Sequence, residues 1–291
     1  MKIFSKYISL VALLSASFFS SQTVAAECAT GTSPVSGCTI GEVNSTYTLT
    51  GDIEPDAGEN GIEFNSSGVN LNLTGDITVN QARSLLILFN DFNTTTMIGN
   101  ITVLGGGVAA GIHIQGSSNV ITQTGDISTR GTQNTGVYII GNDNTINLTG
   151  DMTSVGELST SVRLTIGSAR NTINMTGNIT KSDDNGSAFL LDQGAPLNTI
   201  NLTGNITTGG SNGFNISSSD SNTINMTGNI TTTADGAYGI VLNSSDSNDF
   251  TINGNIITSG TNGNSEPILL ENSDSNTFFI GKSAFHSYKL L

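Results

Sequence analysis

Basic residues are scarce in this sequence, which has 9 Lys and Arg against 23 Asp and Glu in 291 residues. Two of the basic residues, Lys2 and Lys6, lie in an N-terminal stretch that we expect to be removed. The rest of the chain then has 7 basic and 23 acidic residues, a formal net charge of −16. Such a surface repels nucleic acids and anionic lipids, so we expect neither as a partner.

Long hydrophobic runs are also missing after the N-terminus. Residues 1–26 are typical of a secretory signal peptide, with a basic start, the apolar stretch Ile8–Phe19 and the small residues Val24-Ala25-Ala26 at the cleavage site. No later run approaches the ~20 apolar residues that a membrane-spanning helix needs. We therefore expect an exported protein without a transmembrane helix, located at the cell surface, outside the cell or in the periplasm.

There are only two cysteines, Cys28 and Cys38, and both follow the expected cleavage site closely. In an oxidising compartment, two cysteines that close so short a loop are most simply explained by a disulfide. Metal binding is the weaker interpretation, because two thiolates supply only half of a typical zinc shell. We expect the disulfide to hold residues 27–44 as a cap on the N-terminal end of the fold.

What the sequence has in abundance is a repeat. A Thr-Gly-Asp/Asn-Ile motif recurs at intervals of 24 to 27 residues, and a fixed period of this length is typical of a solenoid. The repeats fill residues 45–281, and residues 282–291 form a tail or an incomplete coil. The glycine of the motif occurs at Gly51, Gly75, Gly99, Gly125, Gly150, Gly177, Gly204, Gly228 and Gly254.

Each repeat contains three short segments in which apolar and polar residues alternate, a pattern typical of β-strands with one buried face. In one copy, Ile224 and Met226 are expected to face inward, Asn225 outward, and Ile230 inward again after the glycine bend. A single coil has no partner for its backbone groups, so each coil must pair in parallel with the next. We predict an all-β, right-handed, single-stranded parallel β-helix of about ten coils with three strands per coil.

Two polar columns accompany the glycine corner. Asparagine tolerates a left-handed backbone, and its amide can bond to the coils above and below, so the first column predicts a structural asparagine ladder rather than a ligand site. Stacked carboxylates in the second column could recruit calcium, but the calcium-binding β-roll nonapeptide is missing, so corner hydrogen bonding is favoured. We predict no metal and no cofactor. The ladder comprises Asn93, Asn119, Asn144, Asn171, Asn198, Asn222 and Asn248. The second column comprises Asp52, Asp76, Asn100, Asp126, Asp151, Asn178, Asn205, Asn229 and Asn255.

Most of the length variation falls between the second and third strands of a coil, as in Lys181–Ala188 and Ser259–Pro267. We expect these segments to be loops along one edge, where a binding site would be sought first. Asp183 and Asp184 lie in the first of them, and with Asp192 they could form the carboxylate pair of a glycoside-cleaving enzyme. A solvated loop is the simpler interpretation.

Other candidate catalytic residues are few. Arg130, Arg163 and Arg170 fall on neighbouring coils and could together face an acidic sugar, although scattered surface arginines explain them as well. His113 alternates with apolar neighbours and is expected to face solvent, while His286 lies in the irregular tail. Neither histidine has a recognisable Ser or Cys partner, so no catalytic residue is predicted.

The signal peptide, the Asn-, Thr- and Gly-rich coils such as NTINMTGNIT, and the outward asparagines resemble the passenger domains of bacterial autotransporters. Many of these are right-handed parallel β-helices displayed as adhesins. The likeness covers about residues 40–281, without a diagnostic constellation that would assign functional residues. Family membership would imply export by a C-terminal outer-membrane barrel, but only ten residues follow Gly281, too few for at least eight strands. The chain is therefore expected to be a truncated or split passenger, to use another route, or to stay in the periplasm.

These observations favour a noncatalytic adhesin or self-associating rod. Its partner would be a host or neighbouring cell surface, a polysaccharide or a second copy of the chain. The alternative is an exported carbohydrate-active enzyme, because pectin lyase-like β-helices also house polysaccharide lyases and hydrolases. A third reading is a truncated, nonfunctional passenger fragment.

Overall fold

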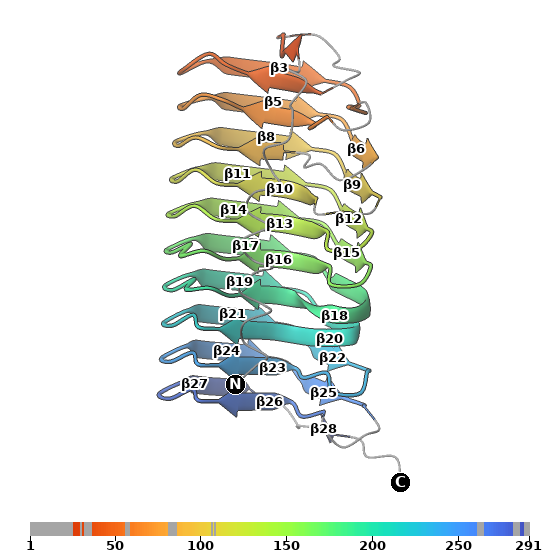
Figure 1. The fold of residues 1–291 in the computed structure, drawn as a ribbon, viewed down its shortest axis with the longest axis vertical. Coiled ribbons are helices and arrows are strands. Elements are labelled where there is room, and N and C mark those ends of the chain that lie inside the picture. The colour runs from red at the N-terminus through yellow and green to blue at the C-terminus, as the bar shows by residue number, and fades with distance from the viewer. Residues whose placement is uncertain are drawn as a thin grey trace, which may run out of the picture.

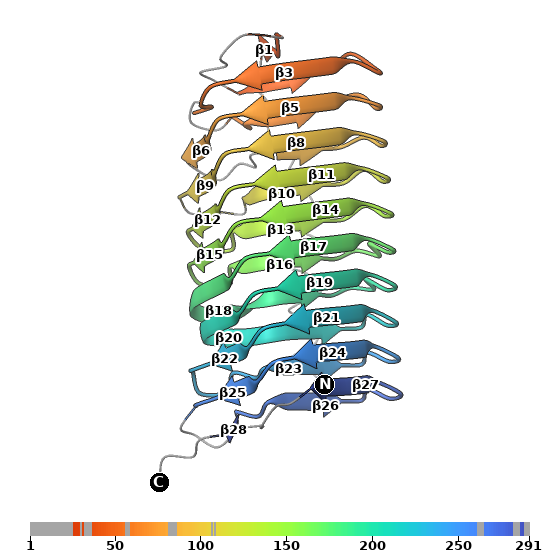
Figure 2. The same cartoon turned by 180° about the vertical axis from the view of Figure 1, so that it is seen from behind.

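A computed structural model describes residues 26–29, 31, 37–55, 59–80, 86–105, 107, 109–260, 265–281 and 286–287. The expected signal peptide and C-terminal tail lie almost entirely outside these residues, as does the middle of the second expected loop. Within them the chain contains no helix and forms a parallel β-solenoid of about nine turns with three faces, so the predicted fold class is confirmed. Figures 1 and 2 show the turns stacked along one axis, from the red N-terminal end to the blue C-terminal end.

The first face is a ten-stranded parallel sheet. Neighbouring strands pair in register over their full length, as where Thr172 lies beside Thr199 and Thr176 beside Thr203. Most inward residues are apolar and most outward residues are polar, because successive side chains of a strand alternate between its two sides; Thr95 and Gln123 are buried polar exceptions. The strands are β3 (Thr46–Thr50), β5 (Asn70–Thr74), β8 (Thr94–Ile98), β11 (Val120–Thr124), β14 (Thr145–Thr149), β17 (Thr172–Thr176), β19 (Thr199–Thr203), β21 (Thr223–Thr227), β24 (Asp249–Asn253) and β27 (Thr277–Gly281).

The other two faces complete each turn. The second face contains β6 (Ile77–Asn80), β9 (Ile101–Leu104), β12 (Ile127–Arg130), β15 (Met152–Val155), the first parts of β18 (Ile179–Leu191) and β20 (Ile206–Ser217), β22 (Ile230–Thr232), β25 (Ile256–Thr258) and β28 (His286–Ser287). The third face contains β1 (Ala26–Glu27), β2 (Cys38–Ile40), β4 (Ile62–Phe64), β7 (Leu86–Leu88), β10 (Ala110–Ile114), β13 (Thr135–Ile139), β16 (Thr160–Leu164), the last parts of β18 and β20, β23 (Ile240–Asn243) and β26 (Ile268–Glu271).

Strands β18 and β20 run continuously from the second face to the third. The expected loop at residues 181–188 is therefore wrong, since these residues belong to β18, with register shifts on both sides of Asp184. The side chain of Lys181 is fully buried, and its Nζ donates to the carbonyls of Gly156 at 3.2 Å and Asp183 at 2.8 Å. An inward lysine thus ties two successive coils together at this corner, and the additional residues form bulges in a strand.

Apolar side chains fill the solenoid from end to end. Ile224 and Ile230, which the alternation predicts to face inward, have no exposed surface. The bend between the first and second faces needs glycine, because a Cβ on Gly204 would lie 1.9 Å from the carbonyl oxygen of Gly177. The backbone of Gly204 also has a φ of 150°, which disfavours other residues. The Thr-Gly-Asp/Asn-Ile motif is therefore the bend of each coil.

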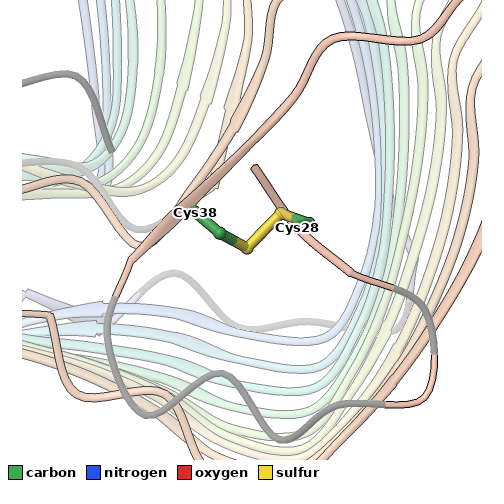
Figure 3. The surroundings of a disulfide bond; sticks show 2 residues. All are labelled: Cys28 and Cys38. Atoms are coloured by element: carbon green, nitrogen blue, oxygen red, sulfur yellow. A yellow bond between two sulfur atoms is a disulfide. The ribbon is translucent and has the colours of Figure 1, made fainter. Parts of the chain in front are cut away.

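The two cysteines lie at the N-terminal end of the core. Cys28 and Cys38 are buried and joined by a disulfide (Figure 3). β1 pairs with β2 and β2 with β4, so the expected cap at residues 27–44 supplies the first rungs of the third face. The backbone N–H of Gly31 donates to the carbonyl of Thr48 at 3.0 Å, which places this segment beside the first strand of the first face.

Candidate functional site

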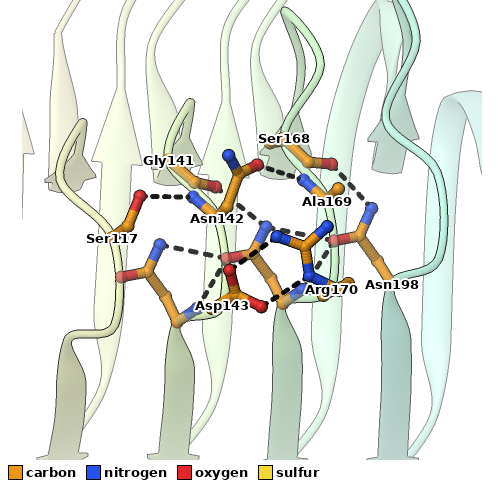
Figure 4. A network of polar contacts seen from close by, with 10 residues as sticks. Ser117, Gly141, Asn142, Asp143, Ser168, Ala169, Arg170 and Asn198 are labelled. Carbon is orange, nitrogen blue, oxygen red and sulfur yellow. Dashed lines mark hydrogen bonds and ion pairs between the residues drawn. The ribbon is translucent and has the colours of Figure 1, made fainter.

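The asparagine ladder lies at the corner between the third and first faces. Asn171 is fully buried, and its Oδ1 accepts hydrogen bonds from the backbone N–H of Asn144 at 2.9 Å and its side-chain amide at 3.0 Å. Its Nδ2 donates to the carbonyl of Gly141 and to Oδ1 of Asn198, both at 3.0 Å (Figure 4). The same backbone-to-side-chain bond joins successive members along the solenoid. The side-chain amides of the ladder therefore form hydrogen bonds that connect neighbouring coils.

A second row of contacts braces the outside of this corner. The backbone N–H of Asn142 donates to Ser117 Oγ at 3.2 Å, and Asn142 Oδ1 accepts from the backbone N–H of Ala169 at 2.7 Å. Arg170 donates two hydrogen bonds of 2.7 Å to Asp143 (Figure 4). These bonds hold the pKa of the exposed Asp143 carboxyl below its usual range. The row therefore connects neighbouring coils in the same way as the ladder behind it.

The Asp and Asn side chains that follow the corner glycine accept hydrogen bonds from the backbone of the next coil. The N–H of Asp76 donates to Asp52 Oδ1 at 2.9 Å, the N–H of Asn100 to Asp76 Oδ1 at 2.7 Å, and the N–H of Asp126 to Asn100 Oδ1 at 2.8 Å. Asp and Asn serve equally here because each offers one acceptor oxygen to the next coil. In the part of the chain that the structure describes, no group of three or more His, Cys, Asp or Glu is placed to hold a metal ion.

The structure gives the candidate carboxylates different partners. Asp183 accepts a hydrogen bond from the backbone N–H of Gly156, at the corner between the second and third faces. Asp192 follows the end of β18 and binds Arg163 through a 2.8 Å ion pair. Asp184 lies between the two register shifts of β18, and its side chain is outside what the structure describes. Asp183 and Asp192 therefore form no shared site.

The three arginines are likewise dispersed. Arg163 lies on β16 of the third face, Arg170 at the asparagine corner, and the exposed Arg130 at the end of β12 on the second face. They do not face a common ligand position. His286 is one of the two candidate histidines, and its side chain lies outside what the structure describes.

His113 is the clearest departure from the sequence-based expectation. On β10 it lies between inward residues and beside Tyr138 of the next coil, yet only 3% of it is exposed, so the expected solvent-facing histidine is wrong. The rings of Tyr138 and Phe89 lie 5.0 and 6.4 Å away, and Nε2 of Gln115 lies 3.3 Å from the imidazole Nε2. Burial lowers the pKa of His113 to about 4, so the imidazole is neutral at neutral pH.

Tyr138 and Arg163 extend this cluster along the third face. The Arg163 guanidinium lies 5.8 Å from the centre of the Tyr138 ring, a distance suited to a cation–π interaction. Burial raises the pKa of Tyr138. The neutral imidazole packs against the phenol ring, and the guanidinium over that ring is ion-paired with Asp192. Three neighbouring coils thus carry three different residues, His113, Tyr138 and Arg163, at one position of the repeat.

The most regular surface of the molecule is the outward side of the first face. Strands β14, β17, β19 and β21 share the pattern Thr-x-Asn-x-Thr, and every outward position is half-buried or exposed. In-register pairing stacks like residues on like. The alternation predicts the outward asparagines, while the threonine columns beside them, which follow from the same alternation, are not among the predicted features. The columns are Thr145, Thr172, Thr199 and Thr223; Asn147, Asn174, Asn201 and Asn225; and Thr149, Thr176, Thr203 and Thr227.

This array is rigid and almost uncharged. The asparagine amides are joined in sequence, with Asn174 donating to Asn147 at 2.8 Å, Asn201 to Asn174 at 2.8 Å and Asn225 to Asn201 at 2.9 Å. Across all ten strands of the face, Asp249 is the one outward residue with a charge. A chain with 23 acidic residues thus presents one nearly neutral, flat side.

Comparison with known proteins gives no assignment. The chain matches no protein-family model, and no curated protein or solved structure is significantly similar to it. Among the described residues, no helix has the length and apolar character needed to cross a membrane. The function has to be argued from the geometry of the faces and corners.

Proposed function

We propose that the protein is an exported, noncatalytic β-helical surface protein of the autotransporter-passenger type, which acts by adhesion or self-association. The observation that supports this proposal is the first face, with ten parallel strands, a nearly neutral outward side and a regular array of threonine and asparagine on four of the strands. A partner can engage such a face at many equivalent positions. Strength then comes from repeated weak contacts on one rigid body rather than from a single pocket.

The arrangement of ionisable residues also supports a noncatalytic role. Glycoside-cleaving enzymes place two carboxyl groups on either side of one bond. Here Asp183 and Asp192 are bound to different groups of the scaffold. His113 is buried and packed between the rings of Phe89 and Tyr138. The Asn and Asp side chains of the two corner columns accept hydrogen bonds from backbone N–H groups of neighbouring coils.

Adhesion is tested with the purified full chain coupled to beads. We expect the beads to aggregate with one another or to be retained on cell surfaces, and Thr176→Glu to weaken this effect, because it adds a carboxylate to a neutral face of an acidic protein. Thr180→Glu is the matched control, since Thr180 is equally exposed in the same coil but lies on the second face. Folded wild-type protein that neither aggregates nor adheres would contradict the proposal.

Catalysis is tested separately on acidic and neutral polysaccharides. We expect no release of reducing ends and no unsaturated products after prolonged incubation. Cleavage that Asp183→Ala or Asp192→Ala abolishes would favour the enzyme alternative. A variant such as Asp143→Ala, whose carboxylate lies at the asparagine corner, controls for general effects on the fold.

A further inference from the structure

We infer that the first face is an ice-binding surface, a function that goes beyond adhesion to cells. The observation is the two-dimensional array of threonine and asparagine on β14, β17, β19 and β21. The partner is crystalline water, and its recognition depends on the spacing, rigidity, chemistry and neutrality of this array.

The spacing of the array is set by the β-sheet. Like residues on successive strands lie about 4.8 Å apart, and outward residues of one strand are separated by two residues, or roughly 6.6 Å. The first distance is close to the repeat of oxygen atoms along one axis of a prism plane of hexagonal ice, and the second is somewhat shorter than the repeat along the other axis. Four identical rows in register, from Thr145 to Thr227, repeat this spacing over a patch rather than at a single point.

The side chains of the array are held in place before any ligand arrives. Threonine is branched at Cβ and has a restricted χ1 angle, so its methyl and hydroxyl groups repeat from coil to coil. The asparagines are fixed by the chain of amide hydrogen bonds between Asn147 and Asn225. Flat sheets are unusual and are stabilised by such stacking and side-chain ladders. Ordering water on this face therefore costs little protein entropy.

The chemistry of the array suits water rather than an ionic partner. Within the described residues, the hydroxyls of Thr145, Thr172, Thr199 and Thr223 are in no hydrogen bond to another protein group, so they are free to bond to water. The threonine methyl groups between them leave neighbouring water with fewer alternative partners, which favours a cage with fixed positions. The four-strand array has no charged side chain, so it neither attracts ions nor imposes the strong hydration shell of a carboxylate.

The other two faces do not repeat this arrangement. The second face has one outward column of hydroxyl residues, Thr78, Thr102, Ser128, Thr153, Thr180, Thr207 and Thr231, and its second outward column is mixed, with Asn80, Leu104, Arg130 and Val155. The third face carries the varied column that includes His113, Tyr138 and Arg163. Among the described strands, three parallel polar columns occur on the first face alone, so the inferred activity belongs to one side of the rod.

The test is the activity of the purified full chain at the surface of ice. We expect it to shape single ice crystals, to produce a gap between melting and freezing temperatures in a nanolitre osmometer, and to be enriched in slowly grown polycrystalline ice. Thr203→Tyr should abolish these effects because a bulky ring interrupts the flat array. Thr207→Tyr is the matched control, since both threonines are exposed in one coil but Thr207 lies on the second face.

Loss in Thr203→Tyr with retention in Thr207→Tyr, at equal melting temperature by circular dichroism, would support the inference. Absence of all three effects in folded wild-type protein would overturn it, as would equal losses in the two variants. The bead assay above freezing remains an independent measurement, so failure on ice leaves adhesion to be judged on its own result.

Discussion

Replacing Asn171 by alanine should destabilise the middle of the solenoid far more than the same change at Asn174, three residues away. Truncating Asn171 removes the side-chain partner of the buried backbone N–H of Asn144 and of the carbonyl of Gly141. A buried polar group that loses its partner costs about 1–3 kcal/mol, so the expected loss is about 4 kcal/mol for the two. Asn174 is half-exposed and water can replace its two amide bonds, so its loss should be about 1 kcal/mol or less.

The difference is measured by urea unfolding followed by circular dichroism and by hydrogen exchange of individual amides. In a solenoid, stability is nearly a sum of coil terms and nearest-neighbour terms, so Asn171→Ala should raise exchange most in β14, β17 and β19. Asn174→Ala should leave exchange in these strands close to that of the wild type. Equal losses for the two variants, or a larger loss at Asn174, would refute the assignment of stability to the corner amides.

Three further outcomes are expected. Ile224→Asp should cost several kcal/mol by urea unfolding, because it places a carboxylate in the apolar interior, while outward Asn225→Asp is tolerated; equal effects would reverse the assigned strand register. Serine at both Cys28 and Cys38 should cost about 3 kcal/mol in unfolding free energy for a loop of this length, and added reductant should lower the stability of the wild type alone. Since the pKa of His113 falls from 6.5 to about 4 on folding, stability should be full above pH 6.5 and decline by about 3 kcal/mol as the pH falls to 4. His113→Gln should flatten this decline in pH-dependent urea titrations, and an unchanged slope would show that other groups cause it.

The repeat carries most of the fold because each of its features has a local cause. The spacing of the corner glycines gives the coil length, and alternation around Ile224 and Asn225 separates inside from outside. The coil length and the inward or outward direction of a side chain both depend on residues that are close together in sequence, so they can be predicted from it. The parallel pairing follows because a lone coil cannot satisfy its own backbone.

The departures arise where contacts join different coils. Residues 181–188 are polar enough to suggest a loop, but buried Lys181 holds them in a strand through carbonyls of two coils. His113 has an alternating polar position, but rings of Phe89 and Tyr138, from the coils before and after, lie beside it. Such packing is set by side chains about 25 residues apart in sequence. The alternation of apolar and polar residues is read within one strand and takes no account of these neighbours.

The uniform bonding of the corner amides makes whole coils interchangeable. Every ladder asparagine accepts from the coil before it and offers its own N–H to the coil after it. If residues 199–222 were deleted, Thr223 would follow Asn198 directly, and Asn198 would bond to Asn248 as Asn222 does now. Removing or duplicating one repeat would thus leave the remaining coils able to pair. The length of the solenoid would change in steps of one strand spacing, about 4.8 Å.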